Sequence, residues 1–201
     1  MKTIVITGGI ATGKSTVVKY LMTLGGDSLV LFDCDAEVSK LLDSGVLARS
    51  LTEQFGAESV LENGAANRSF LRELVFHQPG MRKRLEDIIH PILHQECLAK
   101  QEKARQNSCV RGFVVDVPLF FETSASYEQD AVCVVALSRD TQKVRLAHRN
   151  GFQDDMIEAI LAAQLPILEK VARADFVIWN EGNLSLLHQQ TERFYHHLFH
   201  D

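Results

Sequence analysis

Residues 8–15 read GGIATGKS and match the pattern GxxxxGK[ST]. They follow an apolar run at residues 3–7 and precede a helical pattern at residues 15–24. In this context the glycines let the backbone turn so that several N–H groups face phosphate oxygens, and the helix N-terminus adds a favourable dipole. The motif therefore predicts a strand, a phosphate-binding loop and a helix at the start of an α/β domain.

Two side chains of this motif carry charge chemistry. Lys14 is placed to neutralise the β- and γ-phosphates of ATP, and Ser15 offers a hydroxyl to the Mg²⁺ that bridges them. We expect the loop to bind the nucleotide through Gly9, Ile10, Ala11, Thr12, Gly13, Lys14, Ser15 and Thr16. A chance glycine-rich turn is the alternative interpretation, and the match in both motif and context argues against it.

Short apolar runs separated by helical patterns recur along the chain. They occupy residues 3–7, 29–32, 113–117, 131–137 and 176–179. Continuous apolar runs are typical of parallel strands that are buried on both faces. The sequence thus predicts an α/β, three-layer fold of the P-loop kinase type, with a five-stranded parallel sheet flanked by helices, a helical insertion and a lid.

The insertion is expected at residues 34–108, which show helix and loop patterns and no further strand. Residues 82–84 form a basic run that either faces solvent or contacts phosphate. Pro91 predicts the end or a kink of a helix near His90, because proline lacks an amide donor. His90 itself is open to two interpretations, a structural cap or a substrate contact.

Charge and cysteine usage exclude some classes of protein. A formal net charge of −5 and a pI near 5.9 argue against a general binder of nucleic acids or of membrane surfaces. The four cysteines form no CxxC pair, which indicates reduced thiols and a cytoplasmic protein. No apolar stretch approaches the roughly 20 residues that a membrane span needs.

Asp116 and the residues after it help to distinguish a kinase from a hydrolytic ATPase or a GTPase. It closes the run at residues 113–117, so we expect it at the carboxyl edge of the sheet, as a carboxylate on the Mg²⁺ side. Val117 follows it where a hydrolytic ATPase would have a glutamate. Residues 180–183 read NEGN and do not match the NKxD tetrapeptide of guanine recognition.

Asp33 and Asp35 follow the second apolar run, again at the carboxyl end of a strand. One of them is a candidate general base for an acceptor hydroxyl, and the other a cap of the helix that begins near Ala36. Two capping residues are the alternative. The same reasoning makes Asp33 a neighbour of the loop that follows the first strand.

A helix that begins near Asp140 puts Gln142, Arg145 and Arg149 on one face. Like charges four residues apart repel one another unless an anion joins them. The triphosphate is one such anion, and arginines closing over it stabilise the transferring group. Surface pairs with Asp154 or Asp155 are the alternative.

The order and spacing of several motifs resemble the dephospho-coenzyme A kinase family over almost the whole chain. The resemblance is carried by TGGIATGKS at 7–15, DCD at 33–35, HP at 90–91, DVPLFFE at 116–122, Q..R...R at 142–149 and ADFVIWN at 174–180. It implies transfer of the ATP γ-phosphoryl group to the ribose 3′-hydroxyl of dephospho-CoA. Another nucleoside or nucleotide kinase, or a nucleotide-binding regulatory protein, remains the alternative.

The resemblance also implies roles for single residues and segments. Asp33 becomes the candidate base, residues 34–108 the CoA-side region and residues 139–170 the lid, within one domain whose core is 1–33 and 109–201. Lys14, Asp33 and Arg145 are the expected catalytic residues, Arg149 and Asn180 contact the nucleotide, and Ser15 and Asp116 bind the metal. The expected acceptor contacts are Asp33, Asp35, His90, Asp116, Pro118 and Leu119.

Three departures from the family pattern stand out. Ala11-Thr12 replace the usual Gly-Ser, Cys34 replaces alanine, and Phe120 replaces leucine. None removes a charged or metal-binding group. Ala11 lacks the backbone freedom of glycine, so we expect it to keep a negative φ.

Overall fold

The computed structural model describes residues 1–78, 80–123 and 126–199, apart from the side chains of 149 and 150. Two compact units make up the chain. The first combines Met1–Phe32 with Gln101–Asp201, and the second is Asp33–Lys100. No helix among the described residues is long and apolar enough to span a bilayer.

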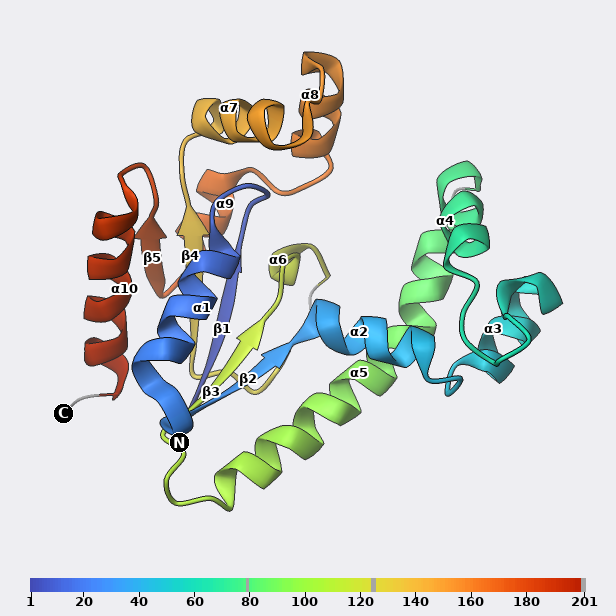
Figure 1. Ribbon diagram of the computed structural model, residues 1–201, viewed down its shortest axis with the longest axis horizontal. Helices are drawn as coiled ribbons and strands as arrows, with labels where there is room; N and C mark the ends of the chain where they lie inside the picture. Colours follow the sequence, from blue (N-terminus) through green and yellow to red (C-terminus); the bar gives the residue numbers. More distant parts are fainter. Residues whose placement is uncertain (79, 124–125, 200–201) are drawn as a thin grey trace. The chain divides into compact units, whose positions relative to one another are not determined.

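A five-stranded sheet of order β2-β3-β1-β4-β5 forms the centre of the first unit (Figure 1). Its strands are β1 (Lys2–Gly8), β2 (Leu29–Asp33), β3 (Gly112–Asp116), β4 (Ala131–Ala136) and β5 (Phe176–Trp179). β1 pairs in parallel with β3 and β4, and β4 pairs in parallel with β5. The five predicted strands are confirmed, with bounds that differ by at most one residue.

The central strands are buried on both faces. Every residue of β3 and β4 is buried, and so is every residue of β1 after Lys2. This explains the continuous apolar runs in the sequence, because alternation appears only where one face meets water. The registers Ile6↔Asp116 and Gly8↔Val135 bring the ends of β1, β3 and β4 to one edge of the sheet.

Helices cover both faces of the sheet. On one face, α1 (Lys14–Gly25) and α10 (Leu184–Phe199) share a hydrophobic cluster with β1, β3, β4 and β5. On the other face, α9 (Ile167–Ala172) contacts β4, and Gln101 near the end of α5 (Met81–Arg105) donates a hydrogen bond to Thr3. The short helices η1 (Gly26–Ser28) and α6 (Phe120–Thr123) complete the layers.

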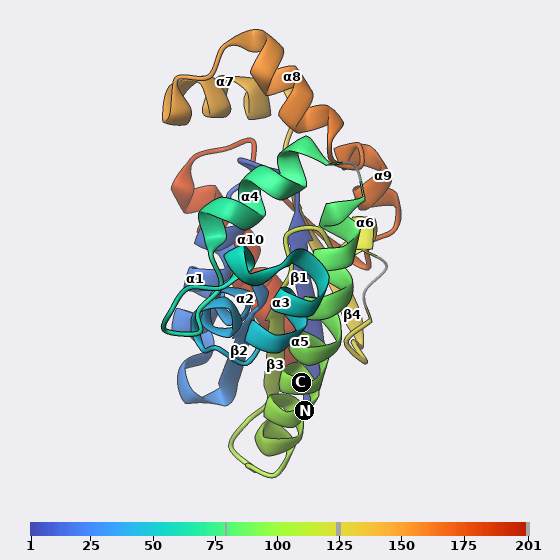
Figure 2. The same ribbon diagram turned by 90° about the vertical axis from the view of Figure 1, so that its right-hand side faces the viewer.

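Two further helices lie beyond the carboxyl ends of β1 and β4 (Figures 1 and 2). They are α7 (Arg139–Asn150) and α8 (Asp154–Ala162). Leu146, Ile157 and Leu161 form a small cluster between them, against which Ile10 and Ala11 of the phosphate loop pack. These two helices therefore rest on the loop that the glycine motif builds.

The second unit is helical. It contains α2 (Cys34–Asp43), α3 (Ala48–Phe55), η2 (Ala57–Ser59), α4 (Arg68–His77) and most of α5. In both views α4 lies along the N-terminal part of α5 (Figures 1 and 2). The prediction of helices without a further strand is confirmed for its described residues, where the β structure is one isolated bridge, Val60↔Ala66.

β3 lies between β1 and β2, so the strands that lead to Asp33 and to the phosphate loop are not hydrogen-bonded to each other. One expectation needs correction. Of the two outcomes predicted at Pro91, the end of a helix near His90 is wrong, because the helix runs through Pro91 as part of the 25-residue α5. Proline removes one amide donor from a helix, and the amide donors of the turns on both sides of Pro91 remain. The helix therefore continues through this position.

Candidate active site

The phosphate loop connects the end of β1 at Gly8 to the start of α1 at Lys14. Gly13 is the N-cap of α1 with φ +91°, and a β-carbon there would collide with the side-chain nitrogen of Asn180. A β-carbon at Gly9 would lie 2.6 Å from Nε2 of Gln142. These two glycines are required because neighbouring side chains approach the backbone of the loop closely.

Ala11 adopts φ +61°, so the expectation of a negative φ is wrong. The loop turns through the left-handed region at this position, where glycine is the favoured residue. Arg145 Nη1 donates a hydrogen bond of 3.3 Å to the carbonyl of Ala11. Packing against Leu146, Ile157 and Leu161 also holds Ala11 in place, and these contacts offset its backbone strain.

Lys14 and Asp116 are in contact across the strand ends. The Lys14 ammonium forms an ion pair with the Asp116 carboxylate, and both side chains are largely buried. Ser15 and Thr16, in the first turn of α1, are exposed. A lysine, a hydroxyl and a carboxylate thus meet at the N-terminus of α1, where the helix dipole favours an anion.

Side chains from the α7–α9 region hold the outer backbone of the loop. Gln142 Nε2 donates to the carbonyl of Ile10 at 2.8 Å, and the Ile10 N–H donates to Gln164 Oε1 at 3.0 Å. Arg145 bridges the carbonyls of Ala11 and Asn180. The predicted face of α7 therefore contacts the phosphate loop, and Arg145 does not form the alternative surface pair. The side chain of Arg149 is outside the described residues.

Asn180 closes the same set of contacts from the end of β5. Its side chain is buried and donates through Nδ2 to the carbonyl of Thr12 at 2.8 Å. Thr12 in turn donates through Oγ1 to the carbonyl of Gly9 at 2.8 Å. The structure therefore joins Asn180 to the phosphate loop, next to Gly13.

Glu181 fixes the start of α7. Ser138 is the N-cap of this helix, and its N–H and hydroxyl both donate to the Glu181 carboxylate at 2.8 Å. Thr141 donates its hydroxyl to the same group. These hydrogen bonds, the one from Thr141 above all, lower the pKa of Glu181. The α7 face that meets the loop is thus anchored by an ionised carboxylate.

Pro118 and Leu119 follow β3 in the first unit and are half-buried. The Pro118 carbonyl accepts a hydrogen bond of 3.3 Å from the hydroxyl of Thr7. The backbone after Asp116 is thus joined to the carboxyl end of β1 by this hydrogen bond. The expected acceptor contacts Asp116, Pro118 and Leu119 are contiguous at this edge of the sheet.

Asp33, Asp35 and His90 belong to the second unit. Asp33 is the N-cap of α2, and its Oδ1 accepts a hydrogen bond of 3.0 Å from Ala36 N–H. Asp35 is exposed in the first turn of α2, and His90 is exposed on α5. Of the two aspartates, Asp33 is therefore the one that caps α2.

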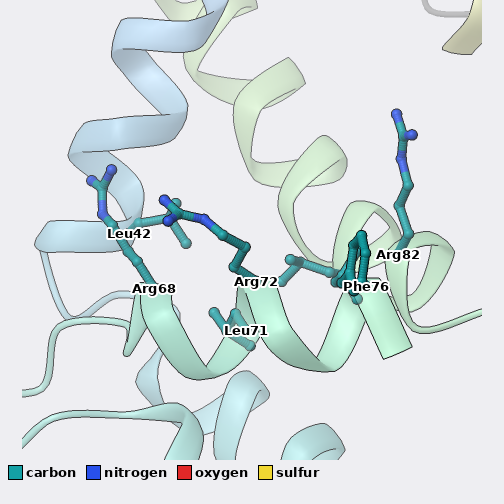
Figure 3. A pocket seen from close by; sticks show the side chains of 8 residues that line it. Leu42, Arg68, Leu71, Arg72, Phe76 and Arg82 are labelled. Carbon is teal, nitrogen blue, oxygen red and sulfur yellow. The ribbon is translucent and has the colours of Figure 1, made fainter. Parts of the chain in front are cut away.

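The second unit also contains an apolar pocket of about 590 Å³ bordered by three arginines (Figure 3). Leu42, Leu71, Val75, Phe76 and Leu85 supply its apolar lining, and Arg68, Arg72 and Arg82 supply the charge. Figure 3 shows the guanidinium groups of Arg68 and Arg72 on the same side of the pocket, near Leu42. Arg68 pairs with Asp43, and Arg82 pairs with Glu86.

Several residues around the phosphate loop escaped the sequence analysis. Gln164, Lys170 and Glu122 contact the loop or one another, yet none was predicted as a site residue. Gln142 was placed on the correct face without an assigned role. Lysine and glutamine are usually exposed, so only the tertiary structure reveals that Lys170 is buried.

A phosphate loop at the carboxyl edge of a parallel sheet, with a lysine, a hydroxyl and a carboxylate at the helix N-terminus, defines a P-loop kinase. Among the described residues no three His, Cys, Asp or Glu side chains form a metal cluster. The family model for dephospho-CoA kinase matches residues 2–185. The chain belongs to the dephospho-CoA kinase family.

Curated relatives agree with this assignment, and a solved structure shares the fold. The chain is 39% identical to dephospho-CoA kinase of Geobacillus kaustophilus, covering 90% of this chain and 88% of the relative. It is 38% identical to that of Anaeromyxobacter dehalogenans, over 96% and 90%. The structure of TT1252 from Thermus thermophilus is similar at a TM-score of 0.74 and 29% identity, over 98% and 97% of the two chains.

Proposed function

We propose that this chain transfers the γ-phosphoryl group of ATP to the ribose 3′-hydroxyl of dephospho-CoA and so produces CoA and ADP. The observation that carries the proposal is the contact of Lys14 with Asp116 at the N-terminus of α1, within a family of this activity. A phosphoryl transfer needs charge stabilisation and positioning more than covalent chemistry. The phosphate loop supplies both.

Lys14 neutralises the charge of the transferring group. The incoming β- and γ-phosphates compete with Asp116 for its ammonium, so the ion pair opens when nucleotide binds. Ser15 and Asp116 offer the hard oxygen ligands that Mg²⁺ prefers, and they fit a metal that keeps its other ligands as water and phosphate. Mg²⁺ held by Ser15 and Asp116 would supply positive charge that offsets the charge of the phosphates.

Arg145 and Asp33 serve the transfer in different ways. Arg145 donates hydrogen bonds to the carbonyls of Ala11 and Asn180, and its charge stabilises the phosphoryl group as negative charge develops. Asp33 is the candidate base for the 3′-hydroxyl. Its cap bond uses Oδ1, and a carboxylate has acceptor capacity for a second partner. By family resemblance Arg149 and Asn180 contact the nucleotide, and Asp35, His90, Pro118 and Leu119 the acceptor.

The arginine-bordered pocket of the second unit suits the far end of the acceptor. Dephospho-CoA carries a diphosphate and a long, largely uncharged pantetheine arm. Arg68 and Arg72 lie four residues apart on α4, and an anion between them removes the repulsion of two like charges. The unit as a whole has eight Lys and Arg against eleven Asp and Glu and is therefore net negative. The positive charge at the pocket is a local feature of its three arginines. We assign the pocket to the diphosphate and the arm.

Mass spectrometry of the products tests the activity. Incubation with Mg-ATP and dephospho-CoA should yield CoA. Lys14→Ala should abolish the product in a chain that still folds, with a lowered melting temperature because the largely buried Asp116 carboxylate loses its partner. Lys19→Ala, on the exposed face of α1, is the matched control and should turn over normally. A wild-type chain that phosphorylates another nucleoside or nucleotide but not dephospho-CoA contradicts the proposal.

Steady-state kinetics test the pocket separately. Arg72→Ala should raise KM for dephospho-CoA by about tenfold and leave KM for ATP unchanged, because it removes an acceptor contact only. Arg49→Ala, on α3 with Glu53 as its partner, is the control. An unchanged KM for dephospho-CoA in Arg72→Ala rejects the pocket and leaves the activity itself standing.

A further inference from the structure

The first unit contains a buried ion pair close to the phosphate loop. Lys170 on α9 has a side chain with 0% exposure, and its Nζ lies 2.6 Å from Oε1 of Glu122 on α6. Glu122 is 16% exposed, and the same Oε1 accepts a hydrogen bond of 3.0 Å from Leu165 N–H. Its other oxygen is buried without a hydrogen-bond partner among the described residues.

This pair also contacts the beginning of the loop. Lys170 Nζ donates a hydrogen bond of 3.1 Å to the carbonyl of Gly8, the last residue of β1. The ammonium therefore connects α9, α6 and the first peptide of the phosphate loop. A β-carbon at Gly8 would lie 2.5 Å from the carbonyl of Val135, so this backbone is tightly enclosed on its β4 side as well.

Because the peptide group is planar, the hydrogen bond to the Gly8 carbonyl also fixes the direction of the Gly9 N–H. In a trans peptide the C=O and the following N–H point in opposite directions, and no cis bond occurs among the described residues. Holding the Gly8 carbonyl toward Lys170 therefore turns the N–H of Gly9 away from Lys170. The bonds to the carbonyls of Ile10 and Thr12 orient the N–H groups of Ala11 and Gly13 in the same manner.

Stability alone does not account for a lysine at this position. Desolvating two charges is costly, and apolar residues of similar volume often replace a buried pair without loss of stability. The half-satisfied carboxylate of Glu122 adds to that cost. A buried pair that contacts the phosphate loop points to a role in shaping the loop.

We propose that Lys170 is a positioning residue for nucleotide binding. Supported by Glu122, it fixes the Gly8–Gly9 peptide so that the loop is preformed for phosphate. The proposal rests on the proposed use of ATP by this loop and adds two residues to the site. It predicts that loss of the Gly8 contact weakens nucleotide affinity and leaves the acceptor side unaffected.

The decisive variant removes both charges. Lys170→Met with Glu122→Met should fold with a melting temperature near that of the wild type, because no unpaired charge remains. Its Kd for Mg-ATP, measured by titration calorimetry, should rise at least tenfold, with an equal loss in kcat/KM for ATP and an unchanged KM for dephospho-CoA. Wild-type Kd and kcat in this double variant would show that the pair is structural only, and the proposal fails.

Two single variants test the proposal independently of the double variant, because they separate the ion pair from the contact with Gly8. Glu122→Gln retains an acceptor oxygen for Lys170 and the contact with Gly8, so its Kd for Mg-ATP should rise less than threefold. Lys170→Met loses that contact and should bind at least tenfold more weakly. Equal losses in the two variants overturn the proposal, because they trace the effect to the pair and not to Gly8.

A matched control comes from the same helix. Arg173 and Glu169 form an exposed pair on α9, 3.7 Å apart. Arg173→Met should leave the Kd for Mg-ATP unchanged, and a tenfold loss there would overturn the assignment to Lys170. A wild-type chain that binds no nucleotide contradicts the proposed function instead, so the two failures are distinguishable.

Discussion

Ala11 has a β-carbon in a left-handed backbone conformation, which costs a residue other than glycine roughly 1–2 kcal/mol. Ala11→Gly removes this strain and adds some flexibility to the unfolded chain. We expect a net gain of about 0.5–1 kcal/mol, which corresponds to about 1–4 °C in Tm for a chain of this size. Differential scanning calorimetry of the two proteins measures it.

Ala163→Gly is the control for this substitution. Ala163 caps α8 with φ −75°, where glycine relieves no strain. The same exchange should therefore lower Tm at this position. A decrease in Tm for Ala11→Gly as well would mean that the loop does not hold Ala11 in the left-handed region.

Asp33 combines a structural and a chemical role that one substitution separates. Asparagine is as good an N-cap as aspartate, so Asp33→Asn should keep the bond to Ala36 N–H and the melting temperature. It removes the basicity, and general-base catalysis is worth about 10²–10⁴-fold. We expect kcat to fall within that range in a coupled ADP-release assay.

Asp35→Asn is the comparison for Asp33. Asp35 is exposed and caps no helix, so this exchange should have little effect on Tm. If Asp35→Asn loses activity and Asp33→Asn keeps it, the base is Asp35 and Asp33 only caps α2. Normal turnover in both variants places the base elsewhere.

Single residues show where sequence reasoning succeeds and where it stops. The motif predicted that Lys14 and Ser15 lie at a helix N-terminus, and the end of an apolar run predicted Asp116 at the sheet edge. The φ of Ala11 was predicted wrongly, because backbone angles in a loop depend on the side chains that pack on it. Gln164 and Lys170 gave no signal, since the loop residues that they contact lie 154 and 162 residues away in the chain.

At the scale of elements, the N-terminus of α7 depends on Glu181. Its folded-state pKa is lowered, so the stabilisation that its hydrogen bonds contribute is present above the ordinary pKa of 4.5. It is lost as the pH falls below that value and Glu181 is protonated. Thermal unfolding should show Glu181→Gln less stable than the wild type at pH 7, with the difference shrinking as the pH falls below 4.5.

Glu62→Gln provides the reference for this pH series, because Glu62 is exposed in the loop after η2. Its melting temperature should follow the wild type at every pH. A difference between Glu181→Gln and the wild type that does not shrink below pH 4.5 would mean that the carboxylate charge does not anchor α7.

Elements that depend on local sequence were predicted well, and features that depend on contacts between distant parts of the chain were not. The central strands β1, β3 and β4 were predicted closely because burial on both faces leaves a continuous apolar run. The edge strands β2 and β5 are only partly buried, and their apolar runs are correspondingly shorter. The order of the strands was not predicted, since the position of β3 between β1 and β2 depends on a connection through a whole inserted unit. The sequence left open whether Pro91 ends or kinks its helix, because proline weakens one turn locally. In the structure α5 continues, and Ile89, Leu93 and Cys97 are buried on both sides of Pro91.

At the scale of the whole molecule, burial of the cysteines within each unit controls thiol reactivity. Cys34, Cys97 and Cys133 are buried and Cys109 is exposed. Burial raises the pKa of the Cys97 thiol to about 12. Burial also raises the pKa of the Cys133 thiol. Because only the thiolate reacts, a native chain should release one equivalent of chromophore rapidly from a disulfide reagent.

The same titration in denaturant should give four equivalents. Cys109→Ser should abolish the fast phase and leave three slow thiols, which identifies the fast one. Rapid reaction of two or more thiols in the native chain would show that a buried cysteine opens to solvent on the time scale of the assay.

The strand order has a consequence for synthesis on the ribosome, where the chain emerges from its N-terminus. β1 is translated first, yet both of its neighbours, β3 and β4, come from residues after 111. Its glycine loop receives its last support from Asn180. The nascent chain therefore carries a complete nucleotide motif and an unpaired apolar strand until Gly112 and the residues after it have been made, and the loop lacks its contact with Asn180 until that residue has emerged.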